Sequence, residues 1–314
     1  ATADSIISRS KAASETLAII ALCKFYTGKS AEAEQDFKNA QGINPASSFV
    51  MLVDGILKMN RGEFEEAAEQ LRFAGEADSR GSPADRVPQS LAHLALSKLY
   101  RKQGLFSEAI QEAHAASKDK RFEAKALALE CRALLADKSS SDAPAQVLKL
   151  IQQAESLNAS DPDLLLSRAF YELEAGKLEE ARKLSNSSMT ILPAEADEYL
   201  LLSKIYGQES KVAEQKAELE KGLKLAEKDP ELLFELGRLY LNDNNAAQAV
   251  NLLRQALERR VKAPELCFLL AEACEKTGDS KESLKYYKES LSQGLCGETS
   301  TKAKAAISRL ELSK

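Results

Sequence analysis

The chain of 314 residues is 44% hydrophobic and 29% charged, a balance typical of a folded globular protein. Its 14 glycines and 8 prolines are too few for a turn-rich all-β protein, and a net charge of −5 argues against a broad nucleic-acid-binding surface. Alanine, leucine, glutamate and lysine dominate the composition. Because these residues are strong helix formers, we expect an all-α fold.

Three sequence features bear on the cellular compartment. No apolar run approaches the roughly 18 residues that a membrane span needs, and the chain does not open with a signal peptide. The five cysteines include no C-x-x-C pair, which favours buried thiols in a reducing compartment. We therefore expect a cytoplasmic protein and, because the chain begins at Ala1, a processed or truncated piece.

Small residues recur along the chain at offsets of five and twelve after a glycine or asparagine. Such self-similarity indicates a repeat architecture. Residues 1–13 lie before the first repeat, and we expect them to form an N-terminal extension or a partial capping helix. The six sets, in chain order, are Gly28, Ala33 and Ala40; Gly62, Ala67 and Ala74; Gly104, Ala109 and Ala116; Gly176, Ala181 and Ser188; Asn244, Ala249 and Ala256; and Gly278, Ser283 and Ser290.

The distances between the sets define the period. The steps from 28 to 62 and from 244 to 278 are both 34 residues, and the step from 176 to 244 is 68, twice 34. The step from 62 to 104 exceeds 34 by eight residues, and the step from 104 to 176 exceeds 68 by four. Segments 78–89 and 137–144 are rich in serine together with proline or glycine. We therefore expect lengthened loops at these two places.

Each period holds two apolar stretches with helical spacing. A loop of about four residues joins them, so the two helices must lie antiparallel. Neither helix can bury its stripe alone, so neighbouring pairs must stack. Small residues such as Gly55, Ala169, Gly237 and Ala271 are expected to let the helix axes approach closely. In residues 230–263 the two stretches are Leu233, Leu236, Gly237 and Tyr240, then Ala249, Leu252, Leu253 and Ala256.

The ends of these helices carry their own signals. Proline opens several pairs, at Pro162, Pro230 and Pro264, as is typical of a first helical turn. An acidic residue follows each proline or its equivalent, and we interpret this row as compensation of the helix dipole rather than as a metal site. Asn244 stands where other repeats have glycine, which predicts a left-handed turn residue. The acidic row is Asp163, Asp197, Glu231 and Glu265.

This pattern resembles the tetratricopeptide repeat, a 34-residue helix–turn–helix unit. The resemblance implies a right-handed superhelical α-solenoid of antiparallel helix pairs. The array is expected over residues 14–297, with a C-terminal capping helix at 298–314 and the register of 124–161 left open. The matching residues are Leu233, Leu236, Gly237, Tyr240, Ala249, Leu253, Ala256 and Pro264, with a second copy at Ala21, Gly28, Ala33, Phe37, Ala40 and Pro45. The eight units are 14–47, 48–81, 90–123, 124–161, 162–195, 196–229, 230–263 and 264–297.

The resemblance also implies that ligands lie on the concave face, which the first helices of the pairs line. The lysine, asparagine and arginine with which chaperone-binding members clamp a terminal carboxylate are absent from these positions. An apolar row flanked by two cations takes their place. Two interpretations stay open: a groove for an amphipathic helix or extended apolar segment, or side chains that pack against their neighbours. The candidate partner-binding residues are Leu166, Phe170, Leu200, Lys204, Phe234, Arg238 and Phe268.

Catalytic signals are weak. The two histidines, His93 and His114, fall on different helices, and His93 is interpreted as a packed side chain. Cys267 and Cys274 are seven residues apart on one helix face with no histidine beside them, which indicates buried core rather than a zinc site. Neither a G-x-x-x-x-G-K-[ST] phosphate loop nor an H-E-x-x-H motif occurs. We therefore expect no enzyme activity, no cofactor and no metal.

The leading functional hypothesis is a non-enzymatic adaptor that binds a protein or peptide partner in its concave groove, mainly through apolar contacts. Two alternatives remain. One is a scaffold that assembles with itself as a homo-oligomer. The other is the regulatory or targeting region of a larger protein whose other domain is absent. None of the three requires a nucleic-acid partner.

Overall fold

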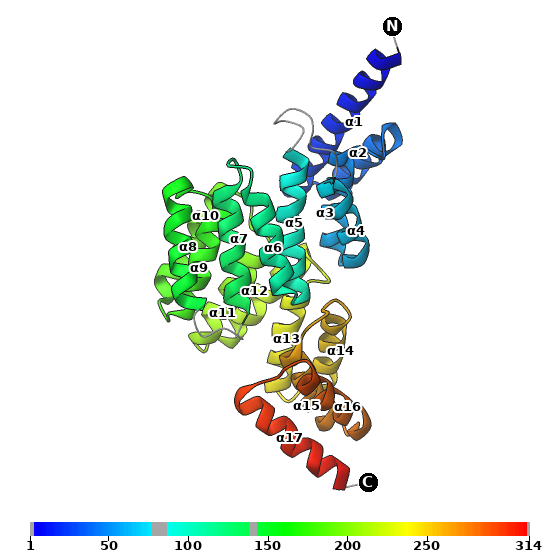
Figure 1. The fold of residues 1–314 in the computed structure, drawn as a ribbon. Helices are drawn as coiled ribbons and strands as arrows, with labels where there is room; N and C mark the ends of the chain where they lie inside the picture. Colours follow the sequence, from blue (N-terminus) through cyan, green and yellow to red (C-terminus); the bar gives the residue numbers. More distant parts are fainter. Residues whose placement is uncertain (1–2, 77–86, 138–142, 313–314) are drawn as a thin grey trace. The chain divides into compact units, whose positions relative to one another are not determined.

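The computed structural model describes residues 3–76, 87–137 and 143–312, and within these residues every regular element is an α-helix. The helices follow one another as eight pairs, α1 with α2 through α15 with α16, and α17 stands alone at the end (Figure 1). This arrangement confirms the predicted all-α solenoid. None of the described helices is long and apolar enough to cross a membrane.

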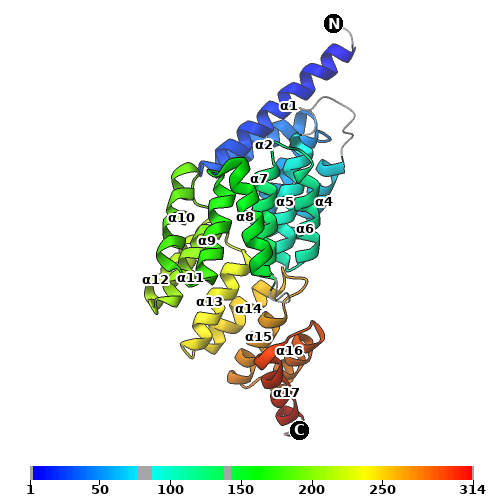
Figure 2. The same cartoon turned by 60° about the vertical axis from the view of Figure 1, so that its left-hand side comes forward.

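The helices group into two compact units. The first unit comprises residues 1–101 and 106–194 and holds α1 to α10, except for the last two residues of α5. Residues 3–13, predicted as an N-terminal extension or a partial capping helix, form the first part of α1, whose N-terminal end projects beyond α2 in Figure 2. The bounds are α1 Ala3–Tyr26, α2 Ser30–Ile43, α3 Ser48–Arg61, α4 Phe64–Glu76, α5 Val87–Gln103, α6 Phe106–Ser117, α7 Glu123–Ala136, α8 Ala143–Asn158, α9 Pro162–Glu174 and α10 Leu178–Ile191.

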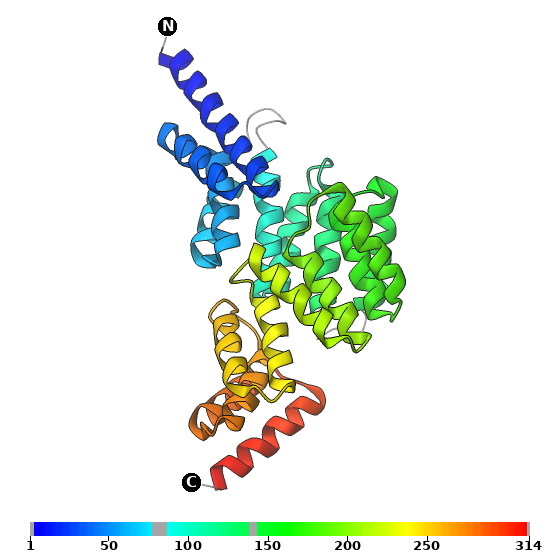
Figure 3. The ribbon, with the colours of Figure 1, turned by 180° about the vertical axis from the view of Figure 1, so that it is seen from behind.

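The second unit comprises residues 195–314 together with the short segment 102–105. It holds three helix pairs and α17, which packs against α16 (Figure 3). α17 lies in the segment for which the sequence predicts a capping helix. The bounds are α11 Ala196–Gln208, α12 Val212–Leu225, α13 Pro230–Asn242, α14 Ala246–Leu257, α15 Pro264–Lys276, α16 Ser280–Ser292 and α17 Gly297–Leu312.

The two predicted long loops lie largely outside the described residues. Of the first, at 78–89, the described part is Val87–Gln89, which already forms the start of α5. Of the second, at 137–144, Asp137 is the C-cap of α7, and Ala143 and Pro144 begin α8. Pro144 is tolerated there because the first turn of a helix does not need its backbone N–H groups.

Close contact within each pair depends on small residues. A Cβ atom added to Gly55 on α3 would lie 2.5 Å from Leu71 Cγ and 3.2 Å from the Ala67 carbonyl oxygen on α4. A Cβ atom on Gly237 of α13 would similarly lie 2.8 Å from Leu253 Cγ on α14. The distances from the added Cβ atoms to the two leucines are shorter than van der Waals contact. The predicted role of these two glycines in letting helices approach is therefore confirmed.

The turns between the helices of a pair repeat one backbone conformation. Asn244 has a φ of 57° and so adopts the left-handed conformation that the sequence predicts. Gly176 lies 68 residues before Asn244, and Gly278 lies 34 residues after it. Both adopt the same conformation, with φ of 74° and 84°. Ser210 completes the 34-residue series with a φ of 59°, which the sequence analysis did not predict. The unit at 196–229 thus keeps the turn geometry of its neighbours without a glycine.

The helix starts use capping together with ion pairs. The Asp161 side chain accepts a hydrogen bond from the Leu164 amide at 3.1 Å, and so caps α9 ahead of Pro162. Asp163, in the same turn, lies 2.9 Å from Lys98 Nζ and 2.8 Å from Lys125 Nζ. Burial would raise the pKa of Asp163, but these two lysines outweigh burial and hold it well below its usual range. This carboxylate therefore stabilises the helix dipole and also ties α5 and α7 to α9.

The start of α11 holds a buried acid. The Glu198 carboxylate accepts a hydrogen bond from the Glu195 amide at 2.9 Å, as part of a capping box. Burial, together with the neighbouring carboxylates of Glu195 and Asp197, raises the pKa of Glu198 to about 7. Glu198 is therefore partly protonated at neutral pH in the folded protein.

Replacement of Gly55 by alanine tests the close-packing constraint. We expect Gly55→Ala to lower the free energy of unfolding by about 1–3 kcal/mol, because the new methyl group overlaps Leu71. Gly42→Ala is the matched control in the same unit, since nothing lies within 4 Å of its added Cβ. The control should be neutral or stabilising by up to about 1 kcal/mol. Urea unfolding followed by circular dichroism measures both, and equal effects would contradict the constraint.

The pKa of Glu198 predicts a pH dependence of stability. The folded protein holds this proton up to about pH 7, whereas the unfolded chain releases it near the ordinary value of 4.5. Stability should therefore fall as pH rises through this window, by up to about 3 kcal/mol. Glu198→Gln should flatten the fall of melting temperature between pH 5 and pH 8. An unchanged pH profile in the variant would show that Glu198 titrates normally.

Candidate partner-binding groove

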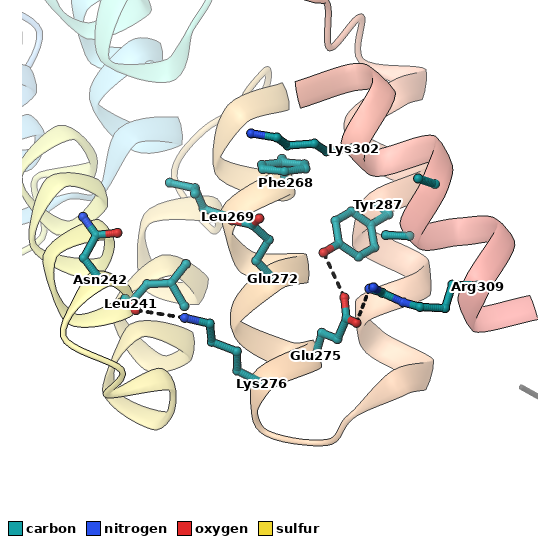
Figure 4. Close-up of a pocket in the computed structure, with 12 residues that line it drawn as sticks. Leu241, Asn242, Phe268, Leu269, Glu272, Glu275, Lys276, Tyr287, Lys302 and Arg309 are labelled. Atoms are coloured by element: carbon teal, nitrogen blue, oxygen red, sulfur yellow. Dashed lines mark hydrogen bonds and ion pairs between the residues drawn. The ribbon is translucent and has the colours of Figure 1, made fainter. Parts of the chain in front are cut away.

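A groove of about 880 Å³ opens in the second unit, between the first helices of the last two pairs and α17 (Figure 4). Large concave pockets are the default location of a binding site. The helix α15 contributes most of one wall, and α17 contributes the opposite wall. The lining residues are Leu241 and Asn242 on α13, Phe268, Leu269, Glu272, Glu275 and Lys276 on α15, Tyr287 on α16, and Lys302, Ala305, Ala306 and Arg309 on α17.

The helical period explains why α15 both closes the core and lines the groove. Leu266, Cys267, Leu270, Ala271 and Cys274 are buried and point into the core of the unit. The adjacent face carries residues at spacings of three and four, which place them above one another on the groove side. These groove-side residues are Phe268, Leu269, Glu272, Glu275 and Lys276.

The helix α17 leaves space for the groove because two of its groove-lining side chains are alanines. Ala303, Ala306 and Leu310 are buried against the preceding pair. Ala305 is exposed and lines the groove beside them. Alanine side chains end at Cβ, so the wall of α17 stands back from α15 at this level. The longer side chains of Lys302 and Arg309 lie at the two ends of this alanine pair.

A polar tie joins three helices on one side of the groove. The Tyr287 hydroxyl on α16 donates to Glu275 Oε2 on α15 at 3.1 Å, and Arg309 on α17 forms an ion pair with the other oxygen of Glu275 (Figure 4). Burial, together with the Glu275 charge, raises the pKa of Tyr287, so its hydroxyl stays a donor at neutral pH. This tie holds α17 against the last helix pair and so fixes the shape of the groove.

The two lysines that line the groove also have partners. Lys276 Nζ donates to the Leu241 carbonyl oxygen and to Asn244 Oδ1, both at 3.3 Å. Lys302 Nζ lies 2.8 Å from Glu298 Oε1, one turn back on α17. Asn244 therefore serves twice, as the left-handed turn residue and as an acceptor for a lysine of the next pair.

Glu272 stands apart from the other charged residues of the groove. Its side chain is half-buried and lies between the α13 and α17 sides of the groove in Figure 4. Among the described residues it has no hydrogen-bond or ion-pair partner, in contrast to Glu275. Burial raises the pKa of Glu272 above its usual range, although Lys276 and Lys302 act against this shift. The groove thus contains one carboxylate that is partly desolvated and unpaired.

The candidate residues in the first unit are packed in its core. Leu166 and Phe170 on α9 are both buried. The guanidinium carbon of Arg132 lies 3.3 Å from the centre of the Phe170 ring, so that a buried cation covers the ring face. Of the two interpretations that the sequence left open for these residues, packing against neighbours describes their position.

The candidate residues in the second unit are divided between core and surface. Leu200 and Phe268 are buried, and Phe268 lines the groove while its ring packs 5.7 Å from that of Tyr287. Phe234 is half-buried against the core of this unit. A charge change at Phe268 would therefore disturb the fold as well as the groove, so Phe268 is unsuited to a binding test.

The two candidate cations share a carboxylate that the sequence analysis did not single out. Lys204 Nζ lies 3.4 Å from Glu235 Oε1, and Arg238 Nε donates to Glu235 Oε2 at 2.9 Å. Glu235 itself is buried, whereas the two cations are partly exposed. The cluster therefore keeps one net positive charge at the surface of α11 and α13.

The groove residues of α17 are not among the candidate residues expected from the sequence, which predicts this helix only as a cap. The 34-residue period contained the signal needed to find them. Adding 34 to Phe268 gives Lys302, and adding 34 to Glu272 gives Ala306, and both line the groove. The helix α17 thus occupies the place of a first helix in a ninth pair.

The cysteines and histidines considered as catalytic candidates are buried in the core or lie beside a glutamate. Cys267 and Cys274 are buried, and burial raises the pKa of both thiols, to about 12 at Cys267, so both are poor nucleophiles at neutral pH. His93 Nδ1 lies 2.6 Å from Glu112 Oε2, and His114 Nε2 lies 3.1 Å from Glu130 Oε2. In residues 3–76, 87–137 and 143–312, no group of three His, Cys, Asp or Glu side chains is arranged to hold a metal ion.

Comparison with known proteins bears on the family and the fold. A family model described as tetratricopeptide repeat matches residues 234–294, which run from α13 to the end of α16. Comparison with curated protein sequences gave no match.

Several solved structures share the arrangement of helices. The human IFIT1 dimer with m7Gppp-AAAA is similar with a TM-score of 0.58 and 14% identity, over 93% of this chain and 71% of that chain. The APC/C hetero-tetramer Cut9-Hcn1 is similar with a TM-score of 0.54 and 14% identity, over 94% of this chain and 63% of that chain. At this level of identity the similarity is one of fold.

Proposed function

Because the chain is a tetratricopeptide repeat protein, we propose that it is a non-enzymatic adaptor whose groove between α13, α15 and α17 binds a segment of a protein partner. The observation that carries the proposal is the groove itself. It joins apolar side chains from three helices to polar groups whose positions are fixed by hydrogen bonds. Apolar surface provides affinity in such sites, and a small number of placed polar groups provides orientation.

The proposed partner-binding face extends from the groove along the first helices of the second unit. We include in this face half-buried Phe234 and the partly exposed Lys204 and Arg238, three of the residues proposed from the sequence. The buried Leu200 would support this face from below rather than contact a partner. The groove volume of about 880 Å³ suits a few side chains of a helix or extended segment, not a whole domain.

Filling the groove should abolish partner binding without unfolding the protein. Ala305 is exposed and lines the groove, so Ala305→Trp adds bulk there while leaving the core unchanged. Ala247→Trp is the matched control, because Ala247 is exposed on α14 and does not line the groove. The two variants are compared by cross-linking capture from a lysate of the source cells and mass spectrometry. Proteins kept by Ala247→Trp should be lost by Ala305→Trp by at least about tenfold.

Circular dichroism of both variants provides the folding control. If Ala305→Trp is folded and retains the same proteins as the control, the groove is not the partner-binding site, and the proposal fails.

A further inference from the structure

The helix α17 is anchored less firmly than the helices beside it. It buries three residues, Ala303, Ala306 and Leu310, and the two alanines end at Cβ. The helix α15, which holds the equivalent place in the preceding pair, buries seven residues. Because buried apolar surface is the main stabilising contribution in folding, the free energy that keeps α17 docked is smaller than the one that keeps α15 in place.

The groove itself takes contacts away from α17. Its volume of about 880 Å³ lies between α15 and α17 (Figure 4), and side chains that border open space lose the dispersion contacts of a packed interface. Two ion pairs connect α17 to the last helix pair, Arg309 with Glu275 and Lys288 with Glu311. The cations of these pairs are 65% and 55% exposed, so water screens both interactions and each contributes little.

The turn that precedes α17 has glycine on both sides. The helix α16 ends at Ser292, and α17 begins at Gly297. Gly294 and Gly297 have φ of 94° and 68°, and nothing lies within 4 Å of a Cβ atom added at either position. Since glycine changes φ at little steric cost, this turn can act as a hinge. The helix α17 can therefore swing away as a unit.

From these observations we infer that α17 is a movable wall of the groove, which leaves the last helix pair while α11 to α16 stay folded and which a bound partner segment holds in the docked position. The inference rests on the proposed function and adds a means of regulating it. A segment in the groove contacts α15 and α17 together, so it binds the docked state more tightly than the released one. Binding then shifts the population towards the docked state.

The polar tie on one side of the groove acts as the latch of this wall. The Tyr287 hydroxyl donates to Glu275 at 3.1 Å, which holds the Glu275 carboxylate in place for Arg309 of α17. Loss of the Arg309 charge should therefore raise the fraction of molecules with α17 released. The apparent affinity for a partner falls in proportion to the docked fraction that is lost.

The test measures how often α17 leaves the pair, by thiol labelling of the full chain. Ala303→Cys places a thiol under α17, and Ala256→Cys is the matched control on α14, since both alanines are fully buried. Native Cys267, also fully buried, serves as a reference within the same molecule. Iodoacetamide labelling followed by mass spectrometry should modify the thiol introduced by Ala303→Cys at least about tenfold faster than the other two.

A second pair of variants tests the latch. Arg309→Gln, added to Ala303→Cys, should speed this labelling by about two- to fivefold, the effect of losing one exposed ion pair. Arg254→Gln removes the pair between Arg254 on α14 and Glu282 on α16 and should leave the rate unchanged. A partner whose capture depends on Ala305 should slow the labelling. Circular dichroism verifies folding, and Ala306→Cys replaces Ala303→Cys if that variant does not fold.

The outcomes separate this inference from the function on which it rests. If the thiol introduced by Ala303→Cys reacts as slowly as Cys267, α17 does not move by itself, and the inference fails while the groove remains a binding site. Fast labelling that a bound, Ala305-dependent partner does not slow also overturns the inference. If no partner depends on Ala305, the proposed function fails, and the regulation inferred from it fails too.

Discussion

Close approach of the two helices in each pair is the constraint on which the structure depends. At Gly55 and Gly237 a single added carbon would overlap a leucine of the partner helix. The helices can pack this closely only where small residues recur in register, and the 34-residue period supplies them. The same period brings the first helices of successive pairs side by side, and it therefore also places α13, α15 and α17 around one groove.

Much of the fold could be predicted because its determinants are local and repeated. Helix length, turn position and capping follow from glycine, proline and apolar spacing, and Asn244 could be recognised as a left-handed residue from its place in the series. Ser210 could not be recognised by residue type, since serine has no special preference for that conformation. Only counting 34 residues from Gly176 identifies it.

The candidate site was harder to predict, because exposure depends on which neighbour covers a side chain. Helical spacing places Leu166 and Phe268 at equivalent positions of their repeats, with Phe170 one turn after Leu166. It does not show that Arg132 covers the Phe170 ring or that Tyr287 packs on Phe268. Pairing of charges is equally non-local. Lys204 and Arg238 meet at Glu235, whereas Glu272 has no partner, and three-dimensional coordinates are needed to distinguish the two carboxylates.

The central claim is that partner binding takes place in the groove of the second unit. Hydrogen exchange of the full chain, with and without a partner protein whose capture depends on Ala305, tests it most directly. The account predicts slower exchange in peptides that cover Leu269–Lys276 on α15 and Lys302–Arg309 on α17. Unchanged exchange in these two segments, with protection confined to α1 to α10, would contradict it.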